Sequence, residues 1–483
     1  MTLAGVSTMS HGRPKRFVIN GVSIFGGEAI SRVATASMAL VVARFFGSES
    51  LGNYGYAVAL TSILLMVPDF GLHLFTVREC STSPRRLSEV FWSVHWAKFG
   101  LASVVIVFSV FFGHWSISSE ERRLLFSILV CRVLLQTFSQ AAMSIFKSRE
   151  QMHYVAVQQF MNSLVVIFWV ALSLWFEARL PVVICGLVAG QLVETCLGWM
   201  ILRRIPLRFE MCNRTVLIET LRSCFPIGLT AILLALNLRL DIFVFSRYRT
   251  SHELGEFNAA QWFVIAFFLV TSLLLTVLFP KLSRLANSER GALYVLSLVK
   301  NGLLATSLGA LFVWLFAYKL IAFLFGDSFA PAAGILRILA PALPLGFLNT
   351  VFFYVLAAAR KRFVCLGTLT LGIAGGTVLS LILTAHYGAA GCATAAVTRE
   401  FFASSIYIVF LIRSSQLRVV GFALLKIFVG STATLAAAVV LAAPAYNETL
   451  WVATWMFLIL MGTMRVLGLP TTGEWRLLTE DQP

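Results

Sequence analysis

Charged side chains occur deep inside several apolar runs of the chain, where a charge needs a partner, water or a ligand. Glu28 and Arg32 stand four residues apart in the first run, so on a helix they lie one turn apart on the same face. A charge at the centre of a membrane costs at least about 2.5 kcal/mol. Two interpretations carry equal weight: a self-neutralising pair buried in protein, or a pair that lines a cavity filled by water or substrate.

Similar charges lie in later apolar runs, in both halves of the chain. Arg239 and Asp241 stand two residues apart near one end of the run 221–245, so they do not share a helix face. The other charged residues at comparable depth are Asp69, Arg132, Glu194, Arg399 and Glu400. Ionisable residues within membrane spans face the bundle interior or a water-filled cavity. The set therefore indicates a charged passage inside a helix bundle.

The chain carries no motif of an enzyme or of a metal or cofactor site. It has no Walker A sequence, no GxSxG, no HExxH and no dinucleotide-binding fingerprint. Its eight cysteines show no CxxC or other ligand spacing, and several lie in apolar runs, where a free cysteine behaves as a small hydrophobic residue. We therefore expect no catalysis, no metal, no cofactor and no disulfide bond.

The composition indicates which elements must position these charges. The 483 residues are 59% apolar and only 12% charged, whereas a soluble domain has about 25% charged residues. Apolar runs of about 20 residues, the length that crosses a bilayer, recur from end to end and give about 14 candidate spans. The predicted fold class is an all-α polytopic membrane protein. The net charge of +16 does not indicate a nucleic-acid partner, because the basic residues lie in short loops and not on one face.

A repeated junction divides the chain into two similar halves. Residues 44–57 read RFFGSESLGNYGYA, and residues 247–260, about 203 positions further on, read RYRTSHELGEFNAA. Each copy lies between one apolar run and the next, and we expect Gly52 and Gly255 to break the helices there. The predicted domains are an N-terminal six-helix lobe (1–205), a C-terminal six-helix lobe (206–415) and two additional helices with a short cytoplasmic tail (416–483).

Basic residues in the loops predict the orientation in the membrane. With the N-terminus in the cytoplasm, the cytoplasmic loops hold about three times as many Lys and Arg residues as the opposite loops. An even number of spans places the C-terminus on the same side. Both copies of the junction then face away from the cytoplasm, which makes the repeat parallel. Transporters built from parallel repeats place their substrate site between the two halves.

In several motifs the chain resembles the polysaccharide transporter, or oligosaccharide flippase, family of the multidrug/oligosaccharidyl-lipid/polysaccharide exporter superfamily. The resemblance rests on both junctions and on VPDFGL (67–72), FPKLSRL (279–285), LFGDSFAPAAGILRIL (324–339) and HYGAAGCATAA (386–396). It implies two six-helix lobes around a central cavity, plus two extra helices. It also implies alternating access in the bacterial inner membrane, which moves an undecaprenyl-diphosphate-linked oligosaccharide to the outer leaflet for surface polysaccharide biosynthesis.

The same resemblance implies roles for individual residues. The cavity of this family is generally cationic, which suits a diphosphate. The candidates for the headgroup site and its outer rim are Arg32, Arg132, Arg239, Arg44 and Arg247. The candidates for a coupling proton or cation are Glu28, Asp69 and Asp241. The expected partners are the lipid-linked oligosaccharide, the membrane, a polysaccharide polymerase and a chain-length regulator.

Three alternative functions stay open at this point. A cation-coupled drug exporter of the same superfamily would need a smaller and more acidic cavity than the basic balance of the spans indicates. A flippase for lipid II is the second alternative. The third is a non-transporting scaffold in polysaccharide assembly, which would need neither a polar interior nor a role for Arg32 or Asp241.

Overall fold

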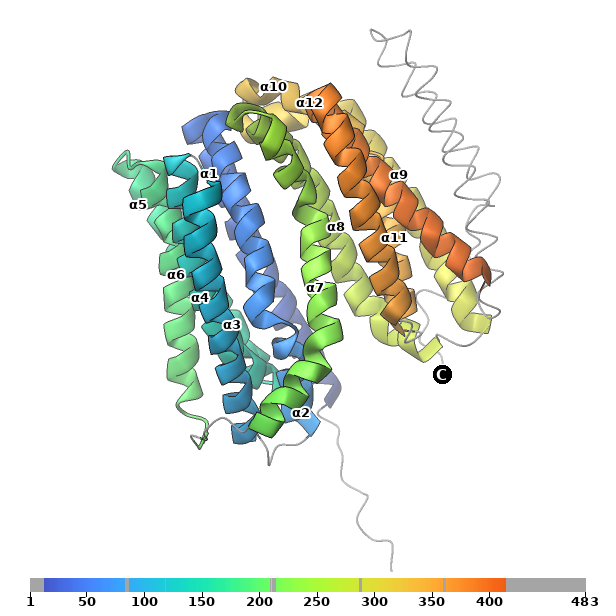
Figure 1. Ribbon diagram of the computed structural model, residues 1–483. Helices are drawn as coiled ribbons and strands as arrows, with labels where there is room; N and C mark the ends of the chain where they lie inside the picture. Colours follow the sequence, from blue (N-terminus) through green and yellow to red (C-terminus); the bar gives the residue numbers. More distant parts are fainter. Residues whose placement is uncertain are drawn as a thin grey trace, which may run out of the picture. The chain divides into compact units, whose positions relative to one another are not determined.

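The computed structural model describes residues 13–82, 87–117, 119–208, 210, 214–285, 289–358 and 362–413. Nearly all of these residues are helical, and the described part of the chain contains no strand (Figure 1). The predicted all-α class is therefore confirmed. The chain divides into two compact units: unit 1 holds Met1–Phe46 and Asn53–Ala235, and unit 2 holds Gly47–Gly52 and Leu236–Pro483.

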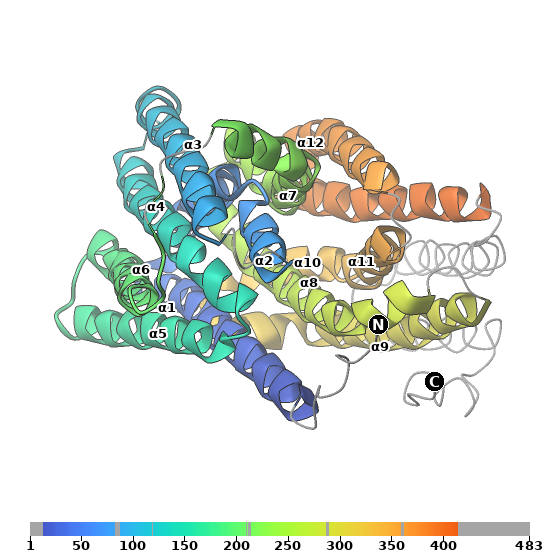
Figure 2. The ribbon, with the colours of Figure 1, turned by 90° about the horizontal axis from the view of Figure 1, so that it is seen from below.

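Unit 1 is organised around helix α6. Its elements are α1 (Arg13–Asp69, without Gly47–Gly52), α2 (Leu72–Thr82), α3 (Leu87–Ser116), α4 (Glu120–Ser148), α5 (Met152–Trp175), α6 (Leu180–Leu202) and α7 (Arg214–Tyr248) as far as Ala235. Helix α6 packs along both α4 and α5, and the three lie side by side in both views (Figures 1 and 2). Glycines allow this closeness. A Cβ at Gly186 would lie 2.7 Å from the Trp169 ring, and one at Gly190 would lie 2.7 Å from Val166.

Unit 2 is organised around helix α11. Its elements are Gly47–Gly52, the end of α7 from Leu236, α8 (Ser251–Leu285), α9 (Glu289–Phe325), the 3-10 turn η2 (Asp327–Phe329), α10 (Ala330–Leu339), α11 (Ala342–Ala358) and α12 (Arg362–Arg413). Helix α11 packs against α8, α9 and α12 (Figure 2). The buried core between these helices includes Leu275, Tyr294, Val351, Phe352 and Tyr407.

The helix lengths fit a membrane protein. Within the described residues, nine helices are long and apolar enough to cross a membrane, or up to ten if α10 and α11, bent by 51°, form one span. Helices α1 and α12 are far longer than the roughly 20 residues that a bilayer requires. Each contains one glycine with a left-handed φ, 82° at Gly47 and 61° at Gly388. Each helix therefore offers one span on either side of its glycine. The two spans predicted beyond residue 416 lie outside the described residues.

The two junction glycines have a different role from the predicted one. Neither Gly52 nor Gly255 breaks a helix: α1 breaks at Gly47, and the second copy breaks between Tyr248 and Ser251. Instead, the glycines let the two junction copies touch. A Cβ at Gly52 would overlap the carbonyl oxygen of Ser251, and one at Gly255 would overlap that of Ser48. The prediction was wrong because a pattern of glycines does not distinguish a turn from a close backbone approach.

The compact units also divide at a different place from the predicted lobes. The basic linker near residue 205 was chosen as the lobe boundary, whereas the units divide inside α7, between Ala235 and Leu236. The first part of α7 belongs to unit 1 because it packs on the break after α1. A Cβ at Gly71 would lie 2.8 Å from Ile227, and one at Gly228 would lie 2.6 Å from the Phe70 ring. The lobe boundaries themselves stay a prediction about the repeat.

Candidate functional site

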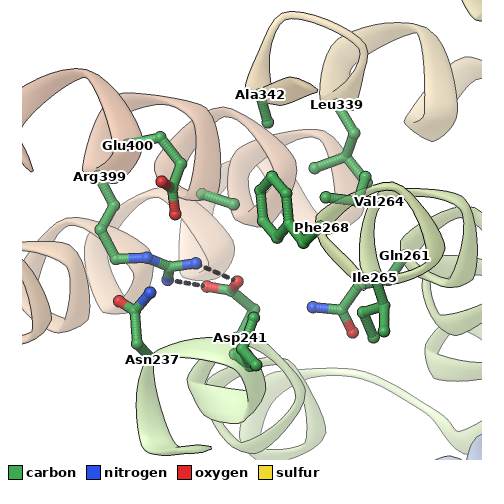
Figure 3. Close-up of a pocket in the computed structure, with 12 residues that line it drawn as sticks. Asn237, Asp241, Gln261, Val264, Ile265, Phe268, Leu339, Ala342, Arg399 and Glu400 are labelled. Carbon is green, nitrogen blue, oxygen red and sulfur yellow. Dashed lines mark hydrogen bonds and ion pairs between the residues drawn. The ribbon is translucent and has the colours of Figure 1, made fainter. Parts of the chain in front are cut away.

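In unit 2, an arginine and an aspartate form a buried pair between α12 and α7. Arg399 Nη1 donates to Asp241 Oδ1 over 2.7 Å, and Arg399 Nη2 donates to Asp241 Oδ2 over 2.9 Å (Figure 3). Both side chains are almost fully buried. The planar guanidinium matches both carboxylate oxygens, which is the strongest geometry for such a pair. A glycine makes room for the arginine, because a Cβ at Gly376 would lie 2.6 Å from Arg399 Cδ.

A second carboxylate, Glu400, lies beside this pair and is held by neutral groups. Asn349 Nδ2 donates to Glu400 Oε2 over 2.7 Å and to the Glu400 carbonyl oxygen over 2.9 Å. Ser404 Oγ donates to Asn349 Oδ1 over 2.7 Å, which fixes the orientation of the amide. Asn237 lies nearby and lines the same cavity as Glu400. We call Asn237, Asp241, Asn349, Arg399 and Glu400 the Arg399 cluster.

A cavity of about 30 Å³ opens onto the Arg399 cluster. Its polar lining comes from Asn237, Asp241, Gln261, Arg399 and Glu400, and Phe268 and Leu339 contribute apolar surface (Figure 3). Gln261 is only 6% exposed, and its Oε1 atom has no hydrogen-bond partner. A polar cavity of this size has room for water.

In unit 1, a buried glutamate is likewise held by neutral donors. Glu194 accepts hydrogen bonds from Ser139 Oγ at 2.6 Å, from Asn162 Nδ2 at 2.5 Å and from Gln191 Nε2 at 3.1 Å. The donors come from α4, α5 and α6 itself. The carboxylate is therefore satisfied without an ion pair. We call Ser139, Asn162, Gln191 and Glu194 the Glu194 cluster.

Arg132 lies near the Glu194 cluster but is not paired with it. The side chain projects from α4 into a cavity of about 10 Å³, whose lining includes Thr35, Asn162 and Ser163. It is close enough to Glu194 and Tyr54 to interact electrostatically. Among the described residues, however, no carboxylate lies within ion-pair distance of Arg132. Its guanidinium therefore lines a polar cavity without an ion pair to any described residue.

The other predicted headgroup residues are spread over the two units. Arg239 is half-buried in α7 within unit 2, and Arg247 is exposed at the end of the same helix. Arg44 is exposed in α1, near the end of the first unit 1 segment at Phe46. Glu28 and Arg32 lie in α1, but their side chains are outside the described part of the structure. Within unit 1, only Arg132 is therefore placed at a described cavity by the structure.

Asp69, a predicted coupling residue, is paired with a buried lysine. It ends α1, just before the left-handed residues Phe70 (φ 38°) and Gly71 (φ 76°). Its Oδ1 atom lies 3.0 Å from Lys98 Nζ, and Lys98 is only 1% exposed. The sequence marked Asp69 as unusual but gave no partner, because Lys98 lies on the next apolar run and no local spacing joins the two.

The amides of both clusters were missed by the sequence interpretation. Asn349, Asn162 and Gln261 are polar residues inside apolar runs, and that position was the available signal. The pair between Asp241 and Arg399 joins residues 158 positions apart. The sequence analysis had excluded a shared helix face for Arg239 and Asp241 but offered no partner for Asp241.

The described residues contain no group of three or more His, Cys, Asp or Glu side chains that could hold a metal ion. The seven cysteines in the described part of the chain are all free thiols. Chemically, the guanidinium of Arg132 can hold an anion, and the buried carboxylates of the two clusters can exchange a proton.

Comparison with known proteins identifies relatives at the level of family and fold. A family model described as polysaccharide biosynthesis protein matches residues 17–286. No curated protein matches the chain. The structure is similar to that of the lipid II flippase MurJ in an inward closed conformation, with 16% identity, a TM-score of 0.69, and coverage of 96% of this chain and 100% of that one.

Drug transporters have the same fold. An inward-facing multidrug resistance MATE family transporter of the MOP superfamily matches with 15% identity and a TM-score of 0.65, over 84% of this chain and 99% of that one. The MATE multidrug transporter DinF-BH matches with 14% identity and a TM-score of 0.59, over 86% of this chain and 99% of that one. At these identities the likeness concerns the fold.

Proposed function

The chain belongs to the polysaccharide biosynthesis protein family and has the fold of the MOP superfamily, and from this premise we propose that it is a flippase for a lipid-linked oligosaccharide. The substrate is of the undecaprenyl-diphosphate type. The protein moves it across the inner membrane by alternating access, for surface polysaccharide biosynthesis. Its expected partners are a polysaccharide polymerase and a chain-length regulator, and both of its termini lie in the cytoplasm.

The observation that supports the proposal is the guanidinium of Arg132, which has no ion pair among the described residues and is partly accessible in a cavity. A charge within a membrane span is costly, and a guanidinium in this position is available to an anionic ligand. A diphosphate supplies oxygens that match the planar fork of arginine. Because the cavity of about 10 Å³ has room for only about one water molecule, the headgroup enters it only when a conformational change widens it. Thr35, Asn162 and Ser163 line the same cavity and make its wall polar. Arg32 and Arg239 are further candidates for the headgroup, with Arg44 and Arg247 at the outer rim.

The coupling residues of the proposal are Glu28, Asp69 and Asp241. Asp69 is paired with Lys98, and Asp241 is paired with Arg399. Each aspartate therefore takes up a proton or cation only when its basic partner moves away. This requirement fits a transporter that changes conformation, because a conformational change is what separates such pairs.

Complementation of a deletion strain tests the role of Arg132. We expect Arg132→Ala to lower surface polysaccharide at least about tenfold, equal to about 1.4 kcal/mol, and to leave untranslocated lipid-linked sugar in the cell. Arg132→Lys should restore part of the activity, because it keeps the charge and loses the fork. Arg204→Ala, which removes an exposed arginine after α6, is the control for general loss of charge. Full activity of Arg132→Ala at normal membrane levels would contradict the proposal.

A lipid II flippase is the second candidate, because the likeness to MurJ extends over 96% of this chain. Lipid II also carries a diphosphate, so the same arginine would serve it. The two candidates are separated by depletion: loss of a lipid II flippase stops cell-wall synthesis and growth, whereas loss of an oligosaccharide flippase removes surface polysaccharide from cells that still divide.

A further inference from the structure

The Arg399 cluster contains two carboxylates and only one guanidinium. Both Nη atoms of Arg399 bind Asp241, and no basic group among the described residues lies within ion-pair distance of Glu400. If Glu400 were ionised, the cluster would carry a net negative charge among buried helices. Such a charge is strongly disfavoured where water does not solvate it.

A neutral amide close to Glu400 can serve either protonation state of its carboxyl group. Asn349 donates to Glu400 through Nδ2, and its Oδ1 atom is engaged by Ser404. Asn237, which lines the same cavity, is an amide with one acceptor and two donors. It can therefore accept from a protonated carboxyl group or donate to a carboxylate.

The adjacent cavity provides a path for a proton. Glu400 and Gln261 line the same cavity of about 30 Å³, and the Gln261 amide points into it (Figure 3). Two buried polar atoms there have no hydrogen-bond partner, Gln261 Oε1 and Arg399 Nε. A cavity with unsatisfied polar atoms and room for water accommodates a water molecule, which can relay a proton to Glu400.

We propose that Glu400 is a proton-binding site of unit 2, and that it exchanges its proton through the cavity shared with Gln261 while Arg399 stays on Asp241. Protonation of Glu400 makes the cluster neutral. Loss of that proton gives Arg399 a second carboxylate to bind and so weakens its hold on Asp241. The use of this step in transport rests on the proposed function, whereas proton binding does not.

The arrangement favours a proton over a metal cation. Both carboxylate oxygens of Asp241 are covered by the guanidinium, and Asn349 directs an amide NH₂ group at Glu400. A metal ion in the cavity would find few free oxygens and would lie beside the positive charge of Arg399. A proton needs only one oxygen of Glu400.

Few other titratable or charged groups face Glu400. Arg399 and Tyr407 are on its own helix, and Asp241 is on α7. Helices α8 and α11 present the amides of Gln261 and Asn349, and the α10 residue that lines the cavity is Leu339. The proton balance of the cluster is therefore set by the two carboxylates and the arginine.

Infrared spectroscopy of the purified full-length protein in lipid nanodiscs tests the site without any substrate. Difference spectra between acidic and alkaline buffers should show the C=O stretch of a buried protonated carboxyl group, shifted in D₂O and lost in Glu400→Gln. Glu253→Gln, which removes a partly exposed carboxylate at the start of α8, should keep the band. A band that survives in Glu400→Gln would overturn the proposal.

A second variant keeps the test decisive if Glu400→Gln does not fold. In Asp241→Asn, Arg399 is freed to neutralise Glu400, so the band should disappear although Glu400 is intact. Its persistence in Asp241→Asn would overturn the proposal.

Proton release on addition of sodium chloride, in wild type and not in Glu400→Gln, would show that a metal cation competes for the site and would also overturn it. A band that persists in a transport-negative Arg132→Ala protein would separate this site from the proposed function.

Discussion

The two units contain similar buried groups but leave opposite charges unpaired. In unit 1, Glu194 is satisfied by neutral donors, and Arg132 faces a cavity without an ion pair in the described structure. In unit 2, both Nη atoms of Arg399 bind Asp241, and Glu400 is the carboxylate without an ionic partner among the described residues. Under our proposals, charges of the same kinds give an anion site in unit 1 and an acid site in unit 2, and the difference is the additional carboxylate in unit 2.

The repeat relates Asp241 to an apolar residue of the first half. When the chain is shifted by the roughly 203 residues that separate the junction copies, Asp241 corresponds to Met38, an apolar residue buried in α1. Glu194 and Glu400 lie in the sixth span of their predicted halves. Each is bound by an asparagine from a neighbouring helix, Asn162 or Asn349. At this shift, however, Glu194 corresponds to Val397 and Glu400 to Leu197, so the two buried glutamates are similar in kind without being equivalent positions of the repeat.

The largest effect expected from this difference concerns stability. Arg399→Met should leave Asp241 and Glu400 buried without a cation, and removing one partner of a buried pair costs about 3–5 kcal/mol. Arg132→Met removes a charge that has no ionic partner, so it should leave stability unchanged or raise it. Thermal unfolding of both variants in the same detergent measures the contrast. Equal losses of stability would mean that Arg132 is paired as tightly as Arg399.

A smaller effect tests the junction packing on which the repeat comparison depends. Gly255→Ala places a methyl group against the Ser48 backbone, and overpacking of this kind costs about 1–3 kcal/mol. Gly100→Ala is the matched control, because a Cβ at this helical glycine meets nothing within 4 Å. The unfolding temperature should fall for the first variant and not for the second. A Gly255→Ala protein as stable as wild type would show that the junction copies do not touch in the membrane.

The smallest effect is expected from a substitution that gives Arg132 a carboxylate partner, as Arg399 has in unit 2. Thr35→Asp places a carboxylate in the cavity that Arg132 lines. The new carboxylate should bind the guanidinium and compete with the diphosphate, lowering transport about tenfold, or about 1.4 kcal/mol. Thr35→Asn, which is similar in size and uncharged, is the control. Undiminished transport by Thr35→Asp in the complementation assay would show that the Arg132 cavity does not hold the headgroup.

The fold was accessible from the sequence because hydrophobic length is a strong signal. A low charged fraction and recurrent apolar runs of about 20 residues leave few soluble alternatives. The structural roles of individual glycines could not be predicted from the sequence. Gly47 and Gly52 lie five residues apart in one motif, and only the backbone shows that the first turns the chain and the second permits contact.

The candidate site was accessible only in part. Depth in an apolar run marked Arg132 and Asp241 as unusual, since a charge there is costly. It did not reveal which charges are paired, because Asp241 meets Arg399 and Asp69 meets Lys98 through tertiary packing between helices. Glu400 is without an ionic partner because Arg399 binds Asp241, and the sequence does not show that pair.

Translocation in proteoliposomes tests the central claim most directly. Purified protein is reconstituted with a labelled undecaprenyl-diphosphate-linked oligosaccharide, and the fraction that becomes accessible to an enzyme outside the vesicles is followed over time. The account predicts rapid exposure of the label with wild type, and with Arg132→Ala a rate close to that of protein-free vesicles. Equal rates for wild type and Arg132→Ala, or no translocation by a folded wild-type protein, would contradict it.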